Sequence, residues 1–299
     1  MTARDPQATP GPLEVLAEAE RTVREQGRAA LCQVVRVEGS TPGKVGWKLL
    51  VRPDGSSWGN LGGGAFEAMV AADAAELLAA SNAGSEVKRY YLTEKAVQGE
   101  PTGMVCGGLM EVLLEVLAAP PLVVVCGGGP VGQAVVRAAA LAGFDSAVAE
   151  DRPRFREPAL FPAATRPVEV SRDYREDFLA PFAGRELYVA IVSRCWETDS
   201  AALAAVVRQA PARLAYLGLM GSRRKIARVR REVEKQGLAL DRGLTLDGAG
   251  LRAPIGLPIG GDTPGEIAIA IVAEMIQVRS AAAAAASSGA ASASGARSA

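Results

Sequence analysis

The sequence contains no histidine among its 299 residues. Catalytic arrangements that depend on imidazole are therefore excluded, including Ser-His-Asp and Cys-His machinery and metal centres with histidine ligands. Histidine is also the side chain that most often transfers a proton at neutral pH. Any proton transfer by this chain must use a lysine, a tyrosine or a carboxylate.

Cysteine pairs, net charge and long apolar runs are absent as well. Four cysteines occur, at Cys32, Cys106, Cys126 and Cys195, and none has C-x-x-C spacing. This spacing argues against a zinc knuckle or a disulfide framework and favours a reducing compartment. The 33 basic and 33 acidic residues cancel, so charge predicts neither a nucleic-acid nor a membrane partner. No run of apolar residues is long enough to span a membrane, and we expect a cytoplasmic globular protein.

The segment Leu122–Asp151 carries the most specific motif. An apolar strand enters a glycine cluster, a helix follows, and a second strand ends at Glu150. This is the G-x-G-x-x-G fingerprint of a Rossmann unit. Gly127 allows the tight turn, Gly129 lets a pyrophosphate approach, and Gly132 lets helix and strand pack closely. Glu150 stands where an acid would accept the ribose hydroxyls, so we predict a phosphate or dinucleotide site here.

The alternation of strand and helix patterns predicts an α/β protein. A smaller mixed α+β domain is expected over 13–117 and a Rossmann-like parallel-sheet domain over 122–279, separated by an Ala-Ala-Pro-Pro linker. The ends, 1–12 and 280–299, are expected to be disordered. Helices are predicted at 13–26, 65–80, 200–209, 223–236 and 263–278, and strands at 29–37, 47–51, 56–60, 86–92, 109–116, 122–125, 166–170, 187–192 and 214–218.

A triple glycine in the first domain suggests an anion site. Gly62, Gly63 and Gly64 run directly into a helix, whose first amides can bind an anion. A tight strand-to-helix connection explains the same residues without a ligand. Glu67 in the first helical turn would be an acid facing that site or merely a favourable partner of the helix dipole. Lys44, in an earlier glycine loop, would hold a phosphate or be a solvated lysine.

A second cradle is predicted where a strand of the Rossmann unit leads into a basic helix. Gly221, Ser222, Arg223, Arg224 and Lys225 open that helix, and a hydroxyl with three cations at a helix N-terminus suits a phosphate. A solvated basic helix face is the alternative.

Cys106 is the reactive candidate outside the fingerprint. It precedes Gly107 and Gly108 in a loop where backbone amides could stabilise a thiolate. A small buried residue at the start of a strand is the alternative. Cys195 follows a strand at the ligand-facing edge of the sheet, and its role stays open. The cysteines inside strands are expected to pack in the core: Cys32 and Cys126.

These motifs together resemble the XdhC/CoxI family, accessory proteins for maturation of molybdenum hydroxylases such as xanthine dehydrogenase. The resemblance covers about residues 13–279. It rests on G-S-T-P at 39–42, G-N-L-G-G-G-A-F-E at 59–67, M-V-C-G-G at 104–108, G-G-G-P-V-G at 127–132, E-D-R-P at 150–153, G-S-R-R-K at 221–225, and A-P-I-G-L at 253–257 running to T-P-G-E-I-A at 263–268.

The resemblance implies a cytoplasmic protein, expected to be a homodimer, that binds molybdenum cofactor as molybdopterin or its cytosine dinucleotide form. Such a protein holds the cofactor while a cysteine desulfurase supplies the sulfido ligand, then passes it to the apo-hydroxylase. Cys106 would contact molybdenum or sulfur, and the glycine loops would cradle the pterin phosphate, with Gly127–Gly132 as one wall of a cleft. Where relatives commonly carry Thr-His, this chain has Ser193-Arg194, so a cation replaces that histidine.

Two other functions fit the sequence. The fingerprint and Glu150 would serve an NAD(P)-dependent oxidoreductase, with Tyr188, Tyr216 or a lysine as its acid or base. The Rossmann unit would also suit a non-catalytic protein that senses a nucleotide. A cofactor chaperone lowers no chemical barrier itself, so whether the chain is an enzyme stays open.

Overall fold

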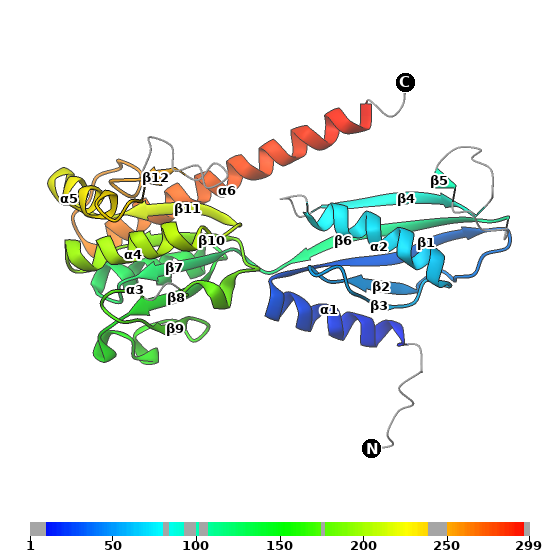
Figure 1. Cartoon of the computed structure of the whole chain (residues 1–299), viewed down its shortest axis with the longest axis horizontal. Coiled ribbons are helices and arrows are strands. Elements are labelled where there is room, and N and C mark those ends of the chain that lie inside the picture. The colour runs from blue at the N-terminus through cyan, green and yellow to red at the C-terminus, as the bar shows by residue number, and fades with distance from the viewer. Residues whose placement is uncertain are drawn as a thin grey trace, which may run out of the picture. The chain divides into compact units, whose positions relative to one another are not determined.

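The chain folds into two compact units, Met1–Ala119 and Pro120–Ala299 (Figure 1). The computed structural model describes residues 10–79, 84–92, 100–101, 107–174, 177–238 and 250–295. The division falls within the Ala-Ala-Pro-Pro stretch expected as a linker. Among the described residues, no helix combines the length and the apolar character needed to cross a membrane.

The N-terminal unit is built on a six-stranded sheet with the order β3-β2-β1-β6-β4-β5. All neighbouring strands run antiparallel except β4 and β5, which pair in parallel. A turn containing Pro-Asp-Gly at 53–55 joins β2 to β3. The strands are β1 (Arg28–Glu38), β2 (Lys48–Val51), β3 (Ser57–Gly59), β4 (Ser85–Tyr91), β5 (Glu100–Pro101) and β6 (Leu109–Ala118).

Two helices, α1 (Pro12–Gln26) and α2 (Gly64–Ala79), cover opposite faces of this sheet (Figure 1). Alternate residues of β1 point to opposite faces of the sheet. Ala30 and Cys32 therefore join the core beneath α2, whereas Leu31 joins the smaller core beneath α1. The apolar run that the sequence presents at this strand is thus a strand buried on both sides.

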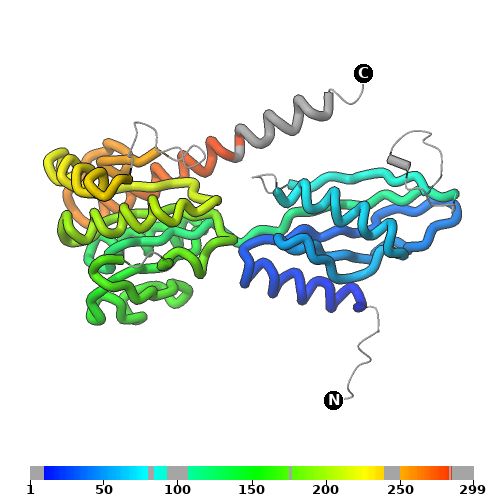
Figure 2. Tube along the Cα trace, in the orientation of Figure 1, coloured from blue at the N-terminus to red at the C-terminus, as the bar shows by residue number. Residues whose placement is uncertain are grey.

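The C-terminal unit is a parallel six-stranded sheet with the order β12-β11-β10-β7-β8-β9 (Figure 2). This is the Rossmann order, because the first strand of the unit, β7, lies beside both the second and the fourth. The chain reverses its direction of winding between β7 and β10, where open sheets bind ligands at their carboxyl ends. The strands are β7 (Leu122–Cys126), β8 (Asp145–Glu150), β9 (Arg166–Glu169), β10 (Leu187–Ile191), β11 (Leu214–Leu219) and β12 (Leu251–Arg252).

Helices cover both faces of the Rossmann sheet. One face packs against α3 (Pro130–Leu141) and α6 (Pro264–Gly295), and the other against α4 (Trp196–Gln209) and α5 (Arg223–Glu234). Short 3-10 turns follow β8 and β9 in place of crossover helices, at η1 (Pro153–Phe155), η2 (Pro158–Leu160) and η3 (Ala180–Phe182).

Two helices differ from the prediction. Helix α4 begins at Trp196 rather than at 200, because Cys195 has the extended backbone of an N-cap and acids follow in the first turn. Helix α6 continues through Gly295, so most of the segment 280–299 expected to be disordered is helical. Alanine dominates this segment and has the highest helix propensity of all residues. The expected disorder over 1–12 falls mostly outside the described residues, and α1 begins at Pro12.

Candidate functional site

Three glycine-rich loops of the N-terminal unit meet around the loop 39–43. A Cβ atom added to Gly62 would lie 2.4 Å from the carbonyl carbon of Pro42, and one added to Gly108 would lie 2.3 Å from the carbonyl oxygen of Ser40. Such contacts are far too short for any side chain, so both positions require glycine. The structure thus brings together motifs that lie up to about 70 residues apart in the sequence.

Other glycines of the same loops have room for an incoming group. Apart from each glycine's own chain neighbours and the backbone of its helix, no atom of the described residues lies within 4 Å of a Cβ built on Gly64 or on Gly107. Gly64 begins α2, Gly63 precedes it, and both Gly64 and Gly107 are exposed. The first amides of a helix lack partners within the helix and attract anions. The triple glycine therefore contributes both a packing position and an approachable one.

Glu67 braces the loop in front of α2. Its Oε1 accepts hydrogen bonds from the backbone N–H groups of Leu61 (3.0 Å) and Gly62 (3.3 Å). The Asn60 side chain also accepts from Gly62, at 2.6 Å. The carboxylate predicted as a ligand-facing acid thus holds the loop's own backbone. A direct bond from Glu67 to a ligand stays a prediction.

The cysteines divide by burial. Cys106 lies outside the described residues, so its predicted contact with a cofactor stays a prediction. Burial raises the pKa of the Cys32 thiol to about 12, and it raises that of Cys126 further, which fits their expected place in the core. Cys195 is half-buried, with its Sγ 3.1 Å from the hydroxyl of Thr198. Among the described residues no group of three or more acids and cysteines is placed to hold a metal ion.

The glycine turn of the Rossmann unit is shaped by close packing. Gly127 has φ +122°, and a Cβ there would lie 2.9 Å from the Cα of Ser193. A Cβ on Gly132 would lie 1.9 Å from the Gly127 oxygen, so this glycine lets α3 pack on the strand as predicted. In the part of the chain that the structure describes, no atom beyond the residues next to Gly129 lies within 4 Å of a Cβ built there. Gly129 is therefore the approachable position of the fingerprint.

Glu150 closes the turn on its other side. Its Oε2 accepts the N–H of Gly128 at 2.8 Å, and Arg152 makes two hydrogen bonds to the carboxylate, each 2.9 Å long. The Phe155 carbonyl oxygen would lie only 2.1 Å from a Cβ on Gly128. Glu150 is 1% exposed. Its carboxylate therefore serves the protein's own backbone and arginine, a role that differs from the predicted contact with ribose hydroxyls.

Arg194 pairs with Asp151, the acid next to Glu150. Its guanidinium donates two hydrogen bonds to the Asp151 carboxylate, at 2.7 and 2.8 Å, and lies 3.8 Å from Glu150. This hydrogen-bonded guanidinium holds the pKa of Asp151 well below its usual range. The edge of the sheet beside the turn therefore carries a network of paired charges.

Asp199, which sequence reasoning did not single out, organises the ends of β10 and β11. It is fully buried in the first turn of α4. It accepts hydrogen bonds from the N–H of Ser193 (3.2 Å) and from its hydroxyl (2.5 Å), and it forms an ion pair with Lys225. Burial raises the pKa of Asp199, while Lys225 and Ser193 oppose that shift. The sequence feature that could have pointed to Asp199 is an acid directly before the mostly apolar stretch 200–207.

At the start of α5, where a phosphate cradle is predicted, two of the polar side chains are already bonded within the protein. The Ser222 hydroxyl caps the helix by accepting the Lys225 N–H at 3.3 Å. The Lys225 ammonium is occupied by Asp199 and by the Met220 carbonyl oxygen (3.2 Å). Arg223 and Arg224 are exposed. Lys44 of the N-terminal unit is exposed as well.

Comparisons with known proteins agree with these motifs. Residues 123–275 match a family model described as the XdhC Rossmann domain, and residues 22–91 match the XdhC and CoxI family. A relative described as uncharacterized protein YqeB, from Escherichia coli (strain K12), is 33% identical over 273 residues. The match covers 90% of this chain and 47% of that protein, so the chain spans about half the relative's length. A crystal structure described as a xanthine dehydrogenase from Bacillus halodurans is 20% identical, with 89% and 96% of the two chains covered and a TM-score of 0.45.

Proposed function

Because the chain belongs to the XdhC and CoxI family, we propose that it is an accessory protein of a xanthine dehydrogenase-type molybdenum hydroxylase. It binds molybdenum cofactor, holds it while a cysteine desulfurase adds the sulfido ligand, and passes it to the apo-hydroxylase. Once delivered, the cofactor supplies the redox chemistry of the hydroxylase. The chain's own residues bind and shield it.

One observation supports this proposal beyond family membership: described residues of the three N-terminal motifs pack against one another. Gly62 and Gly108 pack on the loop 39–43, while Gly64 and Gly107 stay open. A backbone cradle at a helix N-terminus suits the phosphate of a pterin cofactor. Cys106 is next to Gly107 in the chain and is proposed as the contact to molybdenum or sulfur.

The Rossmann turn is less suited to hold that phosphate. The amide of Gly128 is already bound by Glu150, and the Phe155 carbonyl oxygen stands against Gly128. A phosphate would have to displace the Glu150 carboxylate to reach this amide. We therefore place the cofactor phosphate on the N-terminal loops.

The oxidoreductase hypothesis finds less support. Glu150 is held by Arg152 and Gly128. Tyr188 and Tyr216 are 0% and 1% exposed, and burial raises the pKa of both hydroxyls. The Tyr216 hydroxyl donates to Glu274 inside the core, so it is not offered to a substrate. Neither tyrosine is placed to act as an acid or base at the carboxyl edge of the sheet.

The proposal is tested by measuring what the purified protein binds. Protein prepared without oxygen from a molybdenum-replete host is expected to carry molybdenum cofactor, quantified as its fluorescent oxidised pterin. Cys106→Ala is expected to lower cofactor content, and Cys195→Ala, in the Rossmann unit, is expected to leave it unchanged.

Absence of cofactor from the unmodified protein would contradict the proposal. Titration with NADH and NADPH separates the alternatives: micromolar binding together with turnover of a carbonyl substrate would favour the oxidoreductase. Light scattering checks the predicted homodimer.

A further inference from the structure

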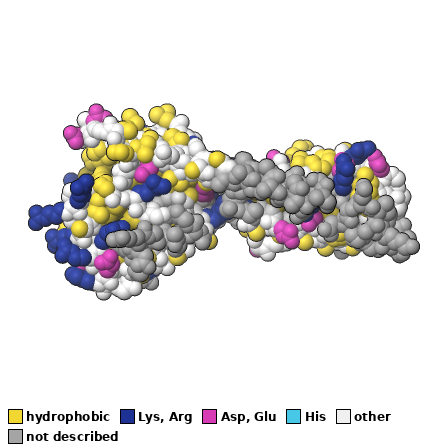
Figure 3. Space-filling view, turned by 90° about the horizontal axis from the view of Figure 1, so that it is seen from above, with side chains coloured by type: hydrophobic (Ala, Val, Ile, Leu, Met, Phe, Trp, Pro, Cys, Tyr) yellow, Lys and Arg dark blue, Asp and Glu magenta, His cyan; other side chains and the backbone are white. Residues whose placement is uncertain are grey.

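Helix α5 carries a line of exposed cations along one face, here named the α5 stripe. Spacing of i, i+4, i+7 and i+11 places its members on the same side of a helix. The line is about 16 Å long at the rise of an α-helix. Figure 3 shows basic side chains gathered at the end of the Rossmann unit that carries α5. The members are Arg224, Arg228, Arg231 and Lys235.

Lys235, which follows the last residue of α5, pairs with Glu232 at 3.0 Å, so the uncompensated charge of the stripe is that of its three arginines. Arg152 and Arg194 of the same unit each contact carboxylates. By contrast, no carboxylate in the described part of the chain forms an ion pair with Arg224, Arg228 or Arg231 within the 4.0 Å limit. The chain as a whole is neutral, so this surplus of positive charge is local.

Part of this positive charge lies at the N-terminus of α5, where the helix dipole disfavours cations. The first turn of α5 holds Arg223, Arg224 and Lys225 and no acid. The helix dipole disfavours a cation there by about 0.3–1 kcal/mol each. Asp199 neutralises Lys225, but the two arginines have no such partner among the described residues. A bound anion would relieve this repulsion.

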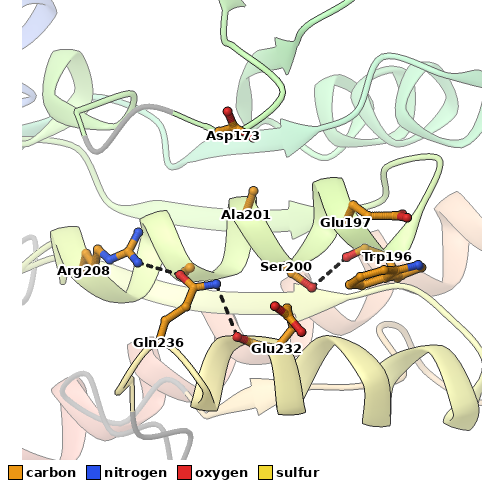
Figure 4. A pocket seen from close by; sticks show the side chains of 9 residues that line it. Asp173, Trp196, Glu197, Ser200, Ala201, Arg208, Glu232 and Gln236 are labelled. Atoms are coloured by element: carbon orange, nitrogen blue, oxygen red, sulfur yellow. Dashed lines mark hydrogen bonds between the residues drawn. The ribbon is translucent and has the colours of Figure 1, made fainter.

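The stripe borders concave surface with an aromatic side chain in it. A hollow of about 490 Å³ is lined by the stripe together with Trp196 and Glu232. The Arg228 guanidinium lies 3.8 Å from the centre of the Trp196 ring. Figure 4 shows the adjoining groove between α4 and α5, with Trp196 at one end and Gln236, bonded to Arg208, at the other.

We propose that the α5 stripe docks an acidic helix of a partner protein. A single phosphate uses two or three donors at one point, whereas this line offers one cation per helical turn. Carboxylates at the same spacing on a facing helix would match it, and the Trp196 ring supplies the aromatic anchor common at interface centres. Glu232, beside the line, already pairs with Lys235, so the three arginines are the cations free to meet the partner's acids. A neutral chain lacks the broad basic field typical of nucleic-acid binding.

The test uses synthetic helical peptides and the full chain. The matched peptide carries four glutamates at i, i+4, i+7 and i+11, and the scrambled peptide has the same composition with the glutamates spread around the helix. Calorimetry is expected to show the matched peptide binding about tenfold more tightly, with an affinity that falls as salt rises. The Arg224→Gln/Arg231→Gln double variant is expected to lose about the same factor.

The control is Arg21→Gln/Arg24→Gln on α1, which removes two exposed, ion-paired arginines and is expected to bind like the unmodified protein. Equal binding of both peptides would overturn the proposal, as would tighter binding of oligothymidylate or inorganic pyrophosphate than of the matched peptide. These peptide comparisons need no variant, and they do not depend on the identity of the cofactor.

Discussion

Each unit has a glycine-rich region with one acid beside it, and the two acids behave alike up to a point. Glu67 and Glu150 both turn their carboxylates onto backbone amides of the neighbouring glycine loop, Gly62 in one unit and Gly128 in the other. Glu67 is half-buried and bonds to backbone, whereas Glu150 is fully buried and also binds Arg152. The Rossmann turn is therefore the more tightly closed of the two.

Each glycine motif contains two kinds of position. Gly62 and Gly132 are required because backbone atoms stand where a side chain would begin. Gly64 and Gly129 have open space instead. Packing glycines serve the fold, and open glycines are where a ligand can reach the backbone. Each kind is tested by a different substitution.

The largest effect is expected from filling the packing positions. Gly62→Ala and Gly132→Ala should each lower the free energy of unfolding by about 3 kcal/mol, because backbone must move to admit the methyl group. Gly62 adds strain, since its φ of +116° is unfavourable for alanine. Urea denaturation followed by circular dichroism measures the loss.

The matched controls are Gly64→Ala and Gly129→Ala, which should change the free energy of unfolding by less than about 1 kcal/mol. A loss at Gly64 or Gly129 as large as that at Gly62 or Gly132 would show that the distinction between packing and open glycines is wrong.

The next largest effect is expected from the two acids, Glu150 and Glu67, whose substitutions should lower the free energy of unfolding by different amounts. Glu150→Gln removes the buried carboxylate that accepts two hydrogen bonds from the Arg152 guanidinium, so we expect a loss of about 2 kcal/mol. Glu67→Gln keeps an oxygen that can accept the same backbone N–H groups, and its cost should stay below about 1 kcal/mol. Thermal and urea unfolding of the two variants measure both values. Equal losses would mean that Arg152 adds nothing to the closure of the Rossmann turn.

The smallest effect concerns Arg194 and depends on pH. Because Arg194 lowers the pKa of Asp151 in the folded state, its contribution is present above the unfolded pKa of about 3.9 and is lost as the pH falls below that value. Arg194→Gln should therefore cost about 0.5–1 kcal/mol at neutral pH for this partly exposed pair, and less near pH 3. Urea unfolding at both pH values tests the sign. A cost that grows on acidification would contradict the assignment.

Local patterns in the sequence were enough for most of the fold. The strand, glycine turn and helix of 122–141 follow from periodicity and from the fingerprint, and the helix expected from 263 is α6, whose start is capped by hydrogen bonds between Thr263 and Glu266. The start of α4 at Trp196 was missed because a cysteine is an unusual N-cap. The helix beyond 280 was missed because an Ala/Ser/Gly-rich composition is typical of disordered tails, although alanine itself favours helix.

The site was harder to predict because it depends on contacts between distant residues. No local pattern shows that Gly62 and Gly108 pack on one loop, or that the Phe155 carbonyl oxygen covers Gly128. The bonding of Glu150 was not foreseen for a related reason, and its contact with ribose hydroxyls stays a prediction. Its position at the end of β8 fits a ribose ligand, but the arginine two residues later takes the carboxylate first.

We propose that the cofactor phosphate contacts Gly64 of the N-terminal unit rather than Gly129 of the Rossmann turn. The direct measurement is the binding of molybdenum cofactor to folded Gly64→Ala and Gly129→Ala proteins, by quenching of tryptophan fluorescence under anaerobic conditions. A methyl group at Gly64 should weaken binding about tenfold by blocking approach to the helix amides, and one at Gly129 should leave it unchanged. Weakened binding in Gly129→Ala with unchanged binding in Gly64→Ala would contradict the account.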